Sequence, residues 1–182
     1  MSRSISDLVR KFGEPQKLVE PLPSIEFPPL SERRHGEVCM AILRRTGGVL
    51  LQTKRNYPKS VMRLPSGGIK AGEDIEHALM REIWEETNLD VHVERFLAVL
   101  GYRNDREHTP FLTYLFFLRE IGGELRCNDP TEKITDWREA PPNELPRYAT
   151  ALRGMEPAWS NWGRFRAASI DVLVAYCDEN GM

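Results

Sequence analysis

The sequence has little cysteine and no long hydrophobic run. Its three cysteines, Cys39, Cys127 and Cys177, are far apart and follow no zinc-ligand or redox spacing, so we expect free thiols in a reducing compartment. No apolar stretch approaches the roughly 20 residues that a membrane-spanning helix requires. The first residues also lack the apolar stretch of a signal peptide. These absences predict a cytoplasmic protein without disulfides or a membrane span.

An excess of charge of one sign is also missing. The 25 Lys and Arg residues nearly balance the 27 Asp and Glu residues, which gives a net charge of −2. Such a balance favours neither a nucleic acid nor a membrane surface as a partner. The chain also lacks internal repeats, and its 182 residues suffice for one hydrophobic core. We therefore predict no nucleic-acid or membrane partner, while a homodimer stays open.

Hydrophobic patterning predicts a mixed α/β chain, of the α+β type, in two parts. Residues 1–35 should hold an amphipathic helix over 4–12 and then a proline-rich, extended strap without regular structure. Residues 36–182 should form the main domain. Its predicted strands are 37–43, 49–54, 91–102, 111–120 and 136–138, its predicted helices are 74–87, 143–153 and 163–177, and its longer loops are 103–110 and 122–135.

The predicted helix over residues 74–87 carries an unusual arrangement of acidic side chains. Apolar residues recur at four-residue spacing from Ile75 to Ile83 and define the face turned to the core. An arc of about 100° that overlaps this apolar face holds three glutamates. They are Glu82, Glu85 and Glu86. Because neighbouring carboxylates repel one another and lose hydration beside a core, they predict a compensating divalent cation, Mg²⁺ or Mn²⁺.

A glycine-rich loop precedes this helix. Gly67, Gly68 and Gly72 supply permissive backbone and lead into a helix N-terminus, where free N–H groups attract phosphate. The spacing from Gly67 through Glu73 and residues 81–86 to Leu89 resembles the Nudix box of pyrophosphohydrolases at every defining position but one. At that position Asn88 replaces glycine. Asn is the next-best residue for a left-handed backbone, so we expect this conformation to end the helix.

The resemblance to the Nudix family implies a fold and an activity. The fold would be an α/β/α sandwich with a curved mixed sheet. The activity would be hydrolysis of a pyrophosphate bond in a nucleoside diphosphate linked to another group, with Mg²⁺ or Mn²⁺ as cofactor and a small nucleotide-type substrate as partner. The resemblance assigns metal binding to Glu82, Glu85, Glu86 and the Gly67 backbone carbonyl, and it assigns orientation of these ligands to Arg81 and Glu73 within the catalytic set.

Other residues are weaker candidates. Glu132 lies in a loop that resembles the family's source of an additional carboxylate ligand, although we favour a solvated glutamate there. Arg63 lies next to the box and is the best candidate among several loop cations for contacting substrate phosphates; the others are Lys54, Arg55, Lys59 and Arg103. Glu76 falls outside the carboxylate arc and is predicted to be an ordinary surface residue.

Alternative functions stay open. The domain could bind or sense a nucleotide without catalysis, although three adjacent carboxylates favour an enzyme. An isomerase acting on isopentenyl diphosphate would share the fold, but its additional cysteine and glutamate motifs are not found. The substrate is not identified, because the proline that ADP-ribose hydrolases usually carry downstream of the box is Asn104 here.

The outer face of the same helix is apolar. It carries Trp84 and Met80 beside His77, which is an unusual composition for a solvated face. We expect the N-terminal strap, the C-terminal segment or a second subunit to cover it.

Overall fold

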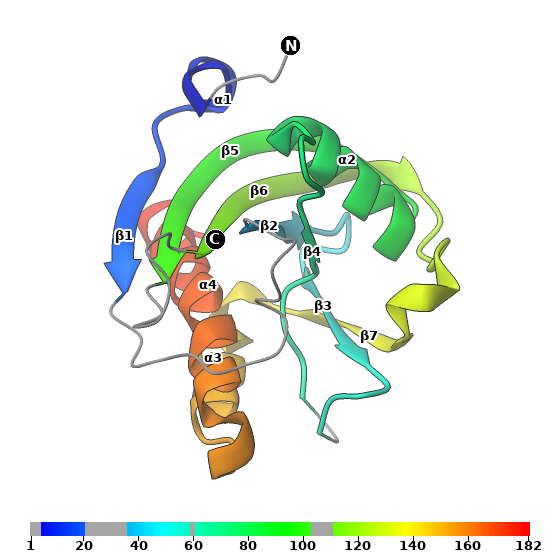
Figure 1. Cartoon of the computed structure of the whole chain (residues 1–182), viewed down its shortest axis with the longest axis vertical. Coiled ribbons are helices and arrows are strands. Elements are labelled where there is room, and N and C mark those ends of the chain that lie inside the picture. Colours follow the sequence, from blue (N-terminus) through cyan, green and yellow to red (C-terminus); the bar gives the residue numbers. More distant parts are fainter. Residues whose placement is uncertain (1–4, 21–35, 59–60, 103–110) are drawn as a thin grey trace.

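The computed structural model describes residues 5–20, 36–58, 61–102 and 111–182. Within these residues seven strands form one mixed sheet between helices on both faces (Figure 1), which confirms the α/β/α sandwich. The strands are β1 (Gln16–Glu20), β2 (Gly36–Leu43), β3 (Val49–Lys54), β4 (Ser66–Gly68), β5 (Leu89–Tyr102), β6 (Phe111–Gly123) and β7 (Ile134–Ala140). The helices are α1 (Ile5–Phe12), α2 (Ile75–Glu86), α3 (Leu145–Arg153) and α4 (Ser160–Glu179), with short 3₁₀ turns η2 (Pro130–Glu132), η3 (Pro142–Glu144) and η4 (Pro157–Trp159).

The sheet has the strand order β1-β5-β6-β2-β3-β7, and β4 pairs with β2. Strands β1 and β5, and strands β2 and β6, run parallel, whereas the other pairs are antiparallel. Figure 1 shows β5 and β6 strongly bent around the molecule. Their pairing shifts register between Asp90 and Val91, between Val93 and Arg95, and between Phe96 and Ala98. Such bulges increase local bending and twist, which explains the curvature.

Strand β2 is the centre of the molecule. All eight of its residues are buried, and those from Val38 to Leu43 alternate between two hydrophobic clusters. Val38 and Met40 contribute to the cluster that includes α1 and α2. Cys39 and Ala41 contribute to the cluster that includes α3 and α4. The two helical layers seen in Figure 1 therefore each have their own core against one face of the sheet.

The N-terminal region departs from the prediction. We expected no regular structure after the first helix, but Gln16 to Glu20 form β1 and pair in parallel with β5. Pro15 and Pro21 flank this proline-free stretch, and an edge strand tolerates prolines at its ends. The prediction was therefore wrong for residues 16–20. The rest of the predicted strap, 21–35, and the predicted loop 103–110 lie outside the described residues.

The other elements lie close to their predicted positions. Strand β3 has the predicted bounds, and β5, β7 and α4 are a few residues longer than expected. Strand β6 continues to Gly123, because Gly122 and Gly123 pair with Asp90 and Leu89 in a stretch that we had predicted as loop. Among the described residues, no helix is long and apolar enough to cross a membrane.

Both ends of α2 have specific caps. The Asp74 carboxylate accepts hydrogen bonds from the backbone N–H groups of Glu76 and His77, which would otherwise be unsatisfied in the first turn. At the other end Asn88 has a φ angle of 52°, so the predicted left-handed conformation is confirmed. Its backbone N–H donates to the carbonyl of Ile83 at 3.0 Å, as in other left-handed helix ends.

The outer face of α2 is not covered by the described part of the chain. Trp84 is 58% exposed and Met80 is 45% exposed. Helix α1 instead approaches the beginning of α2, where Lys11 Nζ lies 2.8 Å from Glu76. Cover by the C-terminal segment was therefore a wrong expectation. Most of the strap, 21–35, lies outside the described residues, so cover by the strap or by a second subunit stays a prediction.

Candidate active site

Helix α2 turns its predicted carboxylate arc inward. Glu82 is 4% exposed and Glu86 is completely buried, while Glu85 is partly buried. Glu76, which we placed outside the arc, is paired with Lys11 of α1 instead. The helical spacing therefore predicted correctly which glutamates face the interior and which one does not.

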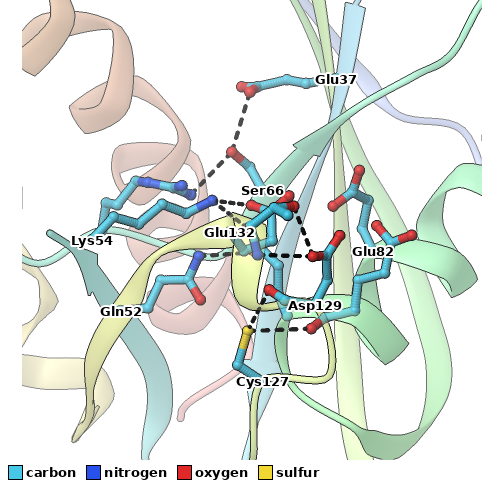
Figure 2. Close-up of polar contacts among 12 residues, drawn as sticks. Glu37, Gln52, Lys54, Ser66, Glu82, Cys127, Asp129 and Glu132 are labelled. Atoms are coloured by element: carbon cyan, nitrogen blue, oxygen red, sulfur yellow. Dashed lines mark hydrogen bonds and ion pairs between the residues drawn. The ribbon is translucent and has the colours of Figure 1, made fainter. Parts of the chain in front are cut away.

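Three carboxylates converge beside α2. Glu82, Glu85 and Glu132 each offer one oxygen, and these oxygens lie within 4.8 Å of one another. Figure 2 shows Glu132 approaching from its own loop toward Glu82. The Glu132 side chain is partly buried and forms an ion pair with Lys54. Our interpretation of Glu132 as a solvated loop residue was therefore wrong.

The loop that carries Glu132 is held by the open end of α2. The last carbonyls of a helix lack partners within the helix. Here the backbone N–H groups of Asn128 and Asp129 donate to the Glu85 carbonyl at 2.9 and 3.2 Å. The Asn128 side chain donates to the carbonyl of Trp84 at 3.0 Å. The end of α2 thus positions both Glu85 and, through the loop, Glu132.

Glu86 contacts strand β3 as well as Glu132 of the carboxylate cluster. Its carboxylate accepts hydrogen bonds from Gln52 Nε2 at 2.9 Å and Lys54 Nζ at 2.7 Å. Burial raises the pKa of Glu86, and the neighbouring Lys54 acts in the opposite direction. Lys54 also bonds Glu132, beside which it is drawn in Figure 2. It therefore lies between two carboxylates.

The roles of Gln52 and Lys54 were not predicted from the sequence. We had considered Lys54 only as a phosphate contact and had not selected Gln52. The available signal was their two-residue separation on a strand, which places both side chains on the same face. What the sequence could not supply was that this face of β3 meets α2.

Arg81 links the glycine-rich loop to the carboxylates. Its guanidinium donates to both oxygens of Glu73 at 2.7 Å and to the Gly68 carbonyl at 2.9 Å. It also donates to Glu82 at 2.6 Å and to Glu85 at 2.9 Å. The hydrogen bonds from Arg81 lower the pKa of Glu73, which stays ionised. This arrangement suits the orienting role that the sequence predicts for Arg81 and Glu73.

The carboxylate cluster has the chemistry of a divalent-cation site. Glu82 Oε2 is buried and has no hydrogen-bond partner among the described residues, and burial raises the pKa of Glu82 to about 7. A divalent ion prefers several such oxygen ligands and would remove this penalty. Gly67 lies directly against the same carboxylate, because a Cβ atom there would lie 1.8 Å from Glu82. A side chain at position 67 would therefore occupy space that the carboxylate uses.

Arg63 is part of the wall of the site. It is 1% exposed, and its Nη1 donates to the Leu64 carbonyl at 2.6 Å and to Ser66 Oγ at 3.0 Å. Its Nε and Nη2 atoms donate to the Tyr57 hydroxyl at 3.2 and 3.0 Å. These bonds fix the guanidinium within the protein. A contact with substrate phosphate stays a prediction.

A cavity of about 500 Å³ connects the carboxylates to an aromatic wall. This volume is within the usual range of small-molecule sites, roughly 300 to 1,000 Å³. Glu82, Glu132 and Lys54 line its polar part. The aromatic residues that line the rest are Tyr57, Phe111, Trp159, Trp162 and Phe165.

Fold and site together define an α/β/α sandwich in which helix and loop carboxylates border a ligand-sized cavity. The NUDIX domain family model matches residues 33–159. The chain belongs to this family, as the spacing from Gly67 to Leu89 indicated.

Similar proteins support the same family assignment. An ADP-ribose pyrophosphatase from Methanocaldococcus jannaschii is 36% identical over 111 residues, which are 59% of this chain and 63% of the relative. A diphosphoinositol polyphosphate phosphohydrolase 3-alpha from Mus musculus is 30% identical over 96 residues, which are 53% of this chain and 50% of the relative. The match thus spans less than two thirds of these relatives' lengths.

Solved structures show the same fold. A UDP-X diphosphatase covers 99% of this chain and 73% of its own chain, with a TM-score of 0.54 and 18% identity. For a NUDIX hydrolase from Nitrosomonas europaea, the match covers 80% of this chain and 90% of the hydrolase chain, with a TM-score of 0.54 and 18% identity.

Proposed function

We propose that this protein hydrolyses a pyrophosphate bond in a nucleoside diphosphate linked to another group. One observation carries the proposal: Glu82, Glu85 and Glu132 place three oxygens within 4.8 Å of one another beside the cavity. An unsatisfied buried oxygen of Glu82 in this cluster calls for a cation. The pyrophosphatases among the relatives supply the reaction class.

A divalent ion, Mg²⁺ or Mn²⁺, would be held by these three glutamates, with Glu86 and the Gly67 carbonyl as further candidate ligands. When bound, such an ion neutralises phosphate charge and lowers the pKa of coordinated water. The protein supplies orientation. Arg81 fixes Glu82 and Glu85 through hydrogen bonds of 2.6 and 2.9 Å, so their oxygens do not need to reorganise when the cation enters.

Glu132 is the carboxylate that we assign to accept the proton of the attacking water. Burial alone would raise its pKa, but Lys54 outweighs burial and lowers the pKa, so Glu132 is ionised at neutral pH. It also lines the cavity, whereas Glu86 is completely buried. A base must be ionised and must face the space where water and substrate bind; Glu132 is ionised and lines the cavity.

A catalytically inactive nucleotide-binding domain is the second candidate function. The aromatic wall of the cavity favours it, because aromatic rings bind nucleobases whether or not hydrolysis follows. Binding of nucleotides without turnover, equally tight with and without divalent ions, would support this alternative.

The test is a panel of nucleotides incubated with Mg²⁺ or Mn²⁺ and scored by phosphate release after coupling to a phosphatase. The panel contains ADP-ribose, other sugar nucleotides, dinucleoside polyphosphates and oxidised nucleotides. Glu85→Gln should lower turnover of the best substrate by roughly two orders of magnitude or more. Glu76→Gln, on the same helix but paired with Lys11, is the matched control and should leave turnover unchanged. Equal effects of the two substitutions would contradict the proposed metal site.

A further inference from the structure

We propose that the aromatic wall of the cavity is the subsite for the nucleobase, and that it selects bases by stacking instead of by reading their hydrogen-bonding edges. The identity of the ligand rests on the proposed function. The residues that carry the inference include Trp162, Phe165 and Arg166 of α4, which lie beyond the residues matched by the family model. The subsite therefore combines residues of the matched range, Tyr57, Phe111 and Trp159, with residues of α4 that lie beyond it.

The rings form two groups, and the Arg166 guanidinium lies between them, 5.8 Å from the centre of the Trp162 ring and 4.5 Å from the centre of the Phe165 ring. Tyr57 lies 4.7 Å from Trp162 between ring centroids, and Trp159 lies 5.5 Å from Trp162 at an interplanar angle of 84°. Trp162 is buried and anchors this group, whereas Tyr57 and Trp159 are only partly buried and line the cavity. Phe111, also partly buried, packs 6.0 Å from Phe165. Partly exposed rings on a cavity wall offer apolar surface that a planar ligand can cover.

Two arginines contact two of these rings and fix them in place. The Tyr57 hydroxyl accepts two bonds from Arg63, and this guanidinium also lies 5.5 Å from the centre of the Tyr57 ring. The Arg166 guanidinium lies 4.5 Å from the centre of the Phe165 ring. Rings fixed in this way lose little conformational freedom when a ligand binds, which favours stacking.

Glu37, Ser66, Arg63 and Arg166, which line the same cavity, are already bonded to one another, whereas Asn56, an exposed residue that also lines it, takes no part in this network. Glu37 Oε1 accepts from Thr113 at 2.9 Å and from Arg166 at 2.8 Å. Glu37 Oε2 accepts from Ser66 at 3.1 Å and from Arg166 at 2.9 Å. A carboxylate has about four acceptor positions, so Glu37 has none left for an amino group of a base. Ser66 Oγ also accepts from Arg63 and Arg166 while it donates to Glu37.

One donor in this network has no partner. Arg166 Nε is buried and forms no hydrogen bond among the described residues. A donor of this kind meets an acceptor on every nucleobase and so distinguishes none of them. This network therefore does not distinguish one base from another. The affinity for a base should depend on the area of its ring that stacks on the aromatic wall.

The test measures binding of adenosine, inosine, cytidine and ribose to the whole chain by calorimetry, in EDTA. These probes carry no phosphate and need no metal. Adenosine should bind at least about fivefold more tightly than ribose, since base stacking on aromatic side chains is worth roughly 1–3 kcal/mol. Inosine, whose edge reverses the donor and acceptor at two positions, should bind within about threefold of adenosine, and cytidine should bind more weakly.

Trp159→Leu should remove most of the advantage of adenosine over ribose. Trp84→Leu is the matched control, because Trp84 is exposed on α2 and does not line the cavity. If Trp159→Leu unfolds, as judged by circular dichroism, Phe111→Leu replaces it. Equal binding of adenosine and ribose to the unmodified protein would overturn the subsite. A difference of more than about tenfold between adenosine and inosine would overturn selection by stacking.

These outcomes are separable from failure of the proposed function. Base-dependent binding in a protein that hydrolyses no member of the nucleotide panel would overturn the hydrolase assignment and support the subsite. Hydrolysis without any contribution of the base to binding would overturn the subsite alone.

Discussion

Glu86 is the most completely buried acidic side chain of the site, and the nearby cations Lys54 and Arg63 favour its ionised form, Lys54 more strongly. Gln52 and Lys54 provide its hydrogen bonds at 2.9 and 2.7 Å. A buried carboxylate that loses its cationic partner keeps its desolvation penalty without compensation. Lys54 therefore has a structural role in the metal-free protein, whatever it contacts when substrate is bound.

Replacing Lys54 by Met keeps most of the side-chain length and removes the charge. We expect the free energy of unfolding to fall by about 2 kcal/mol or more in EDTA. In a Glu86→Gln background the same substitution should have a smaller effect, with a coupling energy of about 1 kcal/mol or more. Urea denaturation of the four proteins gives this double-mutant cycle. Additive effects would show that Lys54 does not compensate the Glu86 charge.

Glu82 should make stability depend on pH in the metal-free protein. Burial raises its pKa to about 7 in the folded state, above the ordinary value of 4.5. Between these values the folded state binds the proton more tightly, so the contribution of Glu82 to stability is present at low pH and is lost as pH rises through 7. Lowering the pH from 8 to 5.5 in EDTA should therefore stabilise the unmodified protein by about 1–2 kcal/mol more than Glu82→Gln. Parallel pH profiles of the two proteins would contradict this prediction.

At the scale of elements, the loop before η2 is bonded to the end of α2. This junction links Glu132 to the α2 carboxylates Glu82 and Glu85. Asn88 Nδ2 donates to the Glu124 carbonyl at 3.0 Å, and the Asn128 side chain donates to Asn88 Oδ1 at 2.8 Å. Asn88 therefore does more than tolerate a left-handed backbone. It also ties the loop that carries Glu132 to the helix that carries Glu85.

Substitutions at Asn88 should separate these two contributions. Asn88→Gly keeps the backbone conformation and loses the side-chain bonds, so we expect a loss of about 0.5–1 kcal/mol of stability. Asn88→Val also introduces left-handed strain and should lose roughly another 1 kcal/mol or more. Both variants should bind Mn²⁺ more weakly, measured by calorimetry, because Glu132 is less well positioned. Unchanged Mn²⁺ affinity in both would show that the loop is positioned by its other bonds.

The sequence predicted those elements whose signal is local. The bounds of β3, the inward arc of α2 and the left-handed Asn88 follow from periodicity and from the conformational preferences of single residues. Strand β1 was missed because prolines surround it and its partner β5 lies far along the chain. Glu132 was undervalued for the same reason, since the bonds that dock its loop on α2 join distant segments. Long-range pairing of this kind leaves no periodic pattern in the sequence.

At the scale of the whole molecule, the cavity joins parts of the chain that pack on opposite faces of the sheet. The carboxylates come mainly from α2, which packs on one face, whereas the aromatic wall comes mainly from η4 and α4 on the other. Strand β4 and the residues before it lie between them, with Ser66 in the polar network and Gly67 against Glu82. A substrate that spans the cavity would therefore connect the two helical layers through one ligand.

The stability of the whole domain should consequently respond to metal. A ligand that binds only the folded state at a concentration of 100 times its Kd stabilises that state by about 2.7 kcal/mol. For a domain of this size the corresponding rise in Tm is about 5–10 °C. We expect saturating Mn²⁺ to produce such a shift by differential scanning fluorimetry, relative to the same protein in EDTA.

Two substitutions on α2 make this prediction specific. Glu82→Gln should abolish most of the Mn²⁺-induced shift, because it removes the charge of a carboxylate whose Oε2 has no hydrogen-bond partner in the described part of the chain. Glu76→Gln removes an equal charge from the same helix and lowers the baseline Tm only slightly, since exposed ion pairs contribute about 0–1 kcal/mol. Its Mn²⁺-induced shift should match that of the unmodified protein. Equal shifts in all three proteins would place the bound ion outside the carboxylate cluster, because general charge screening by Mn²⁺ does not depend on Glu82.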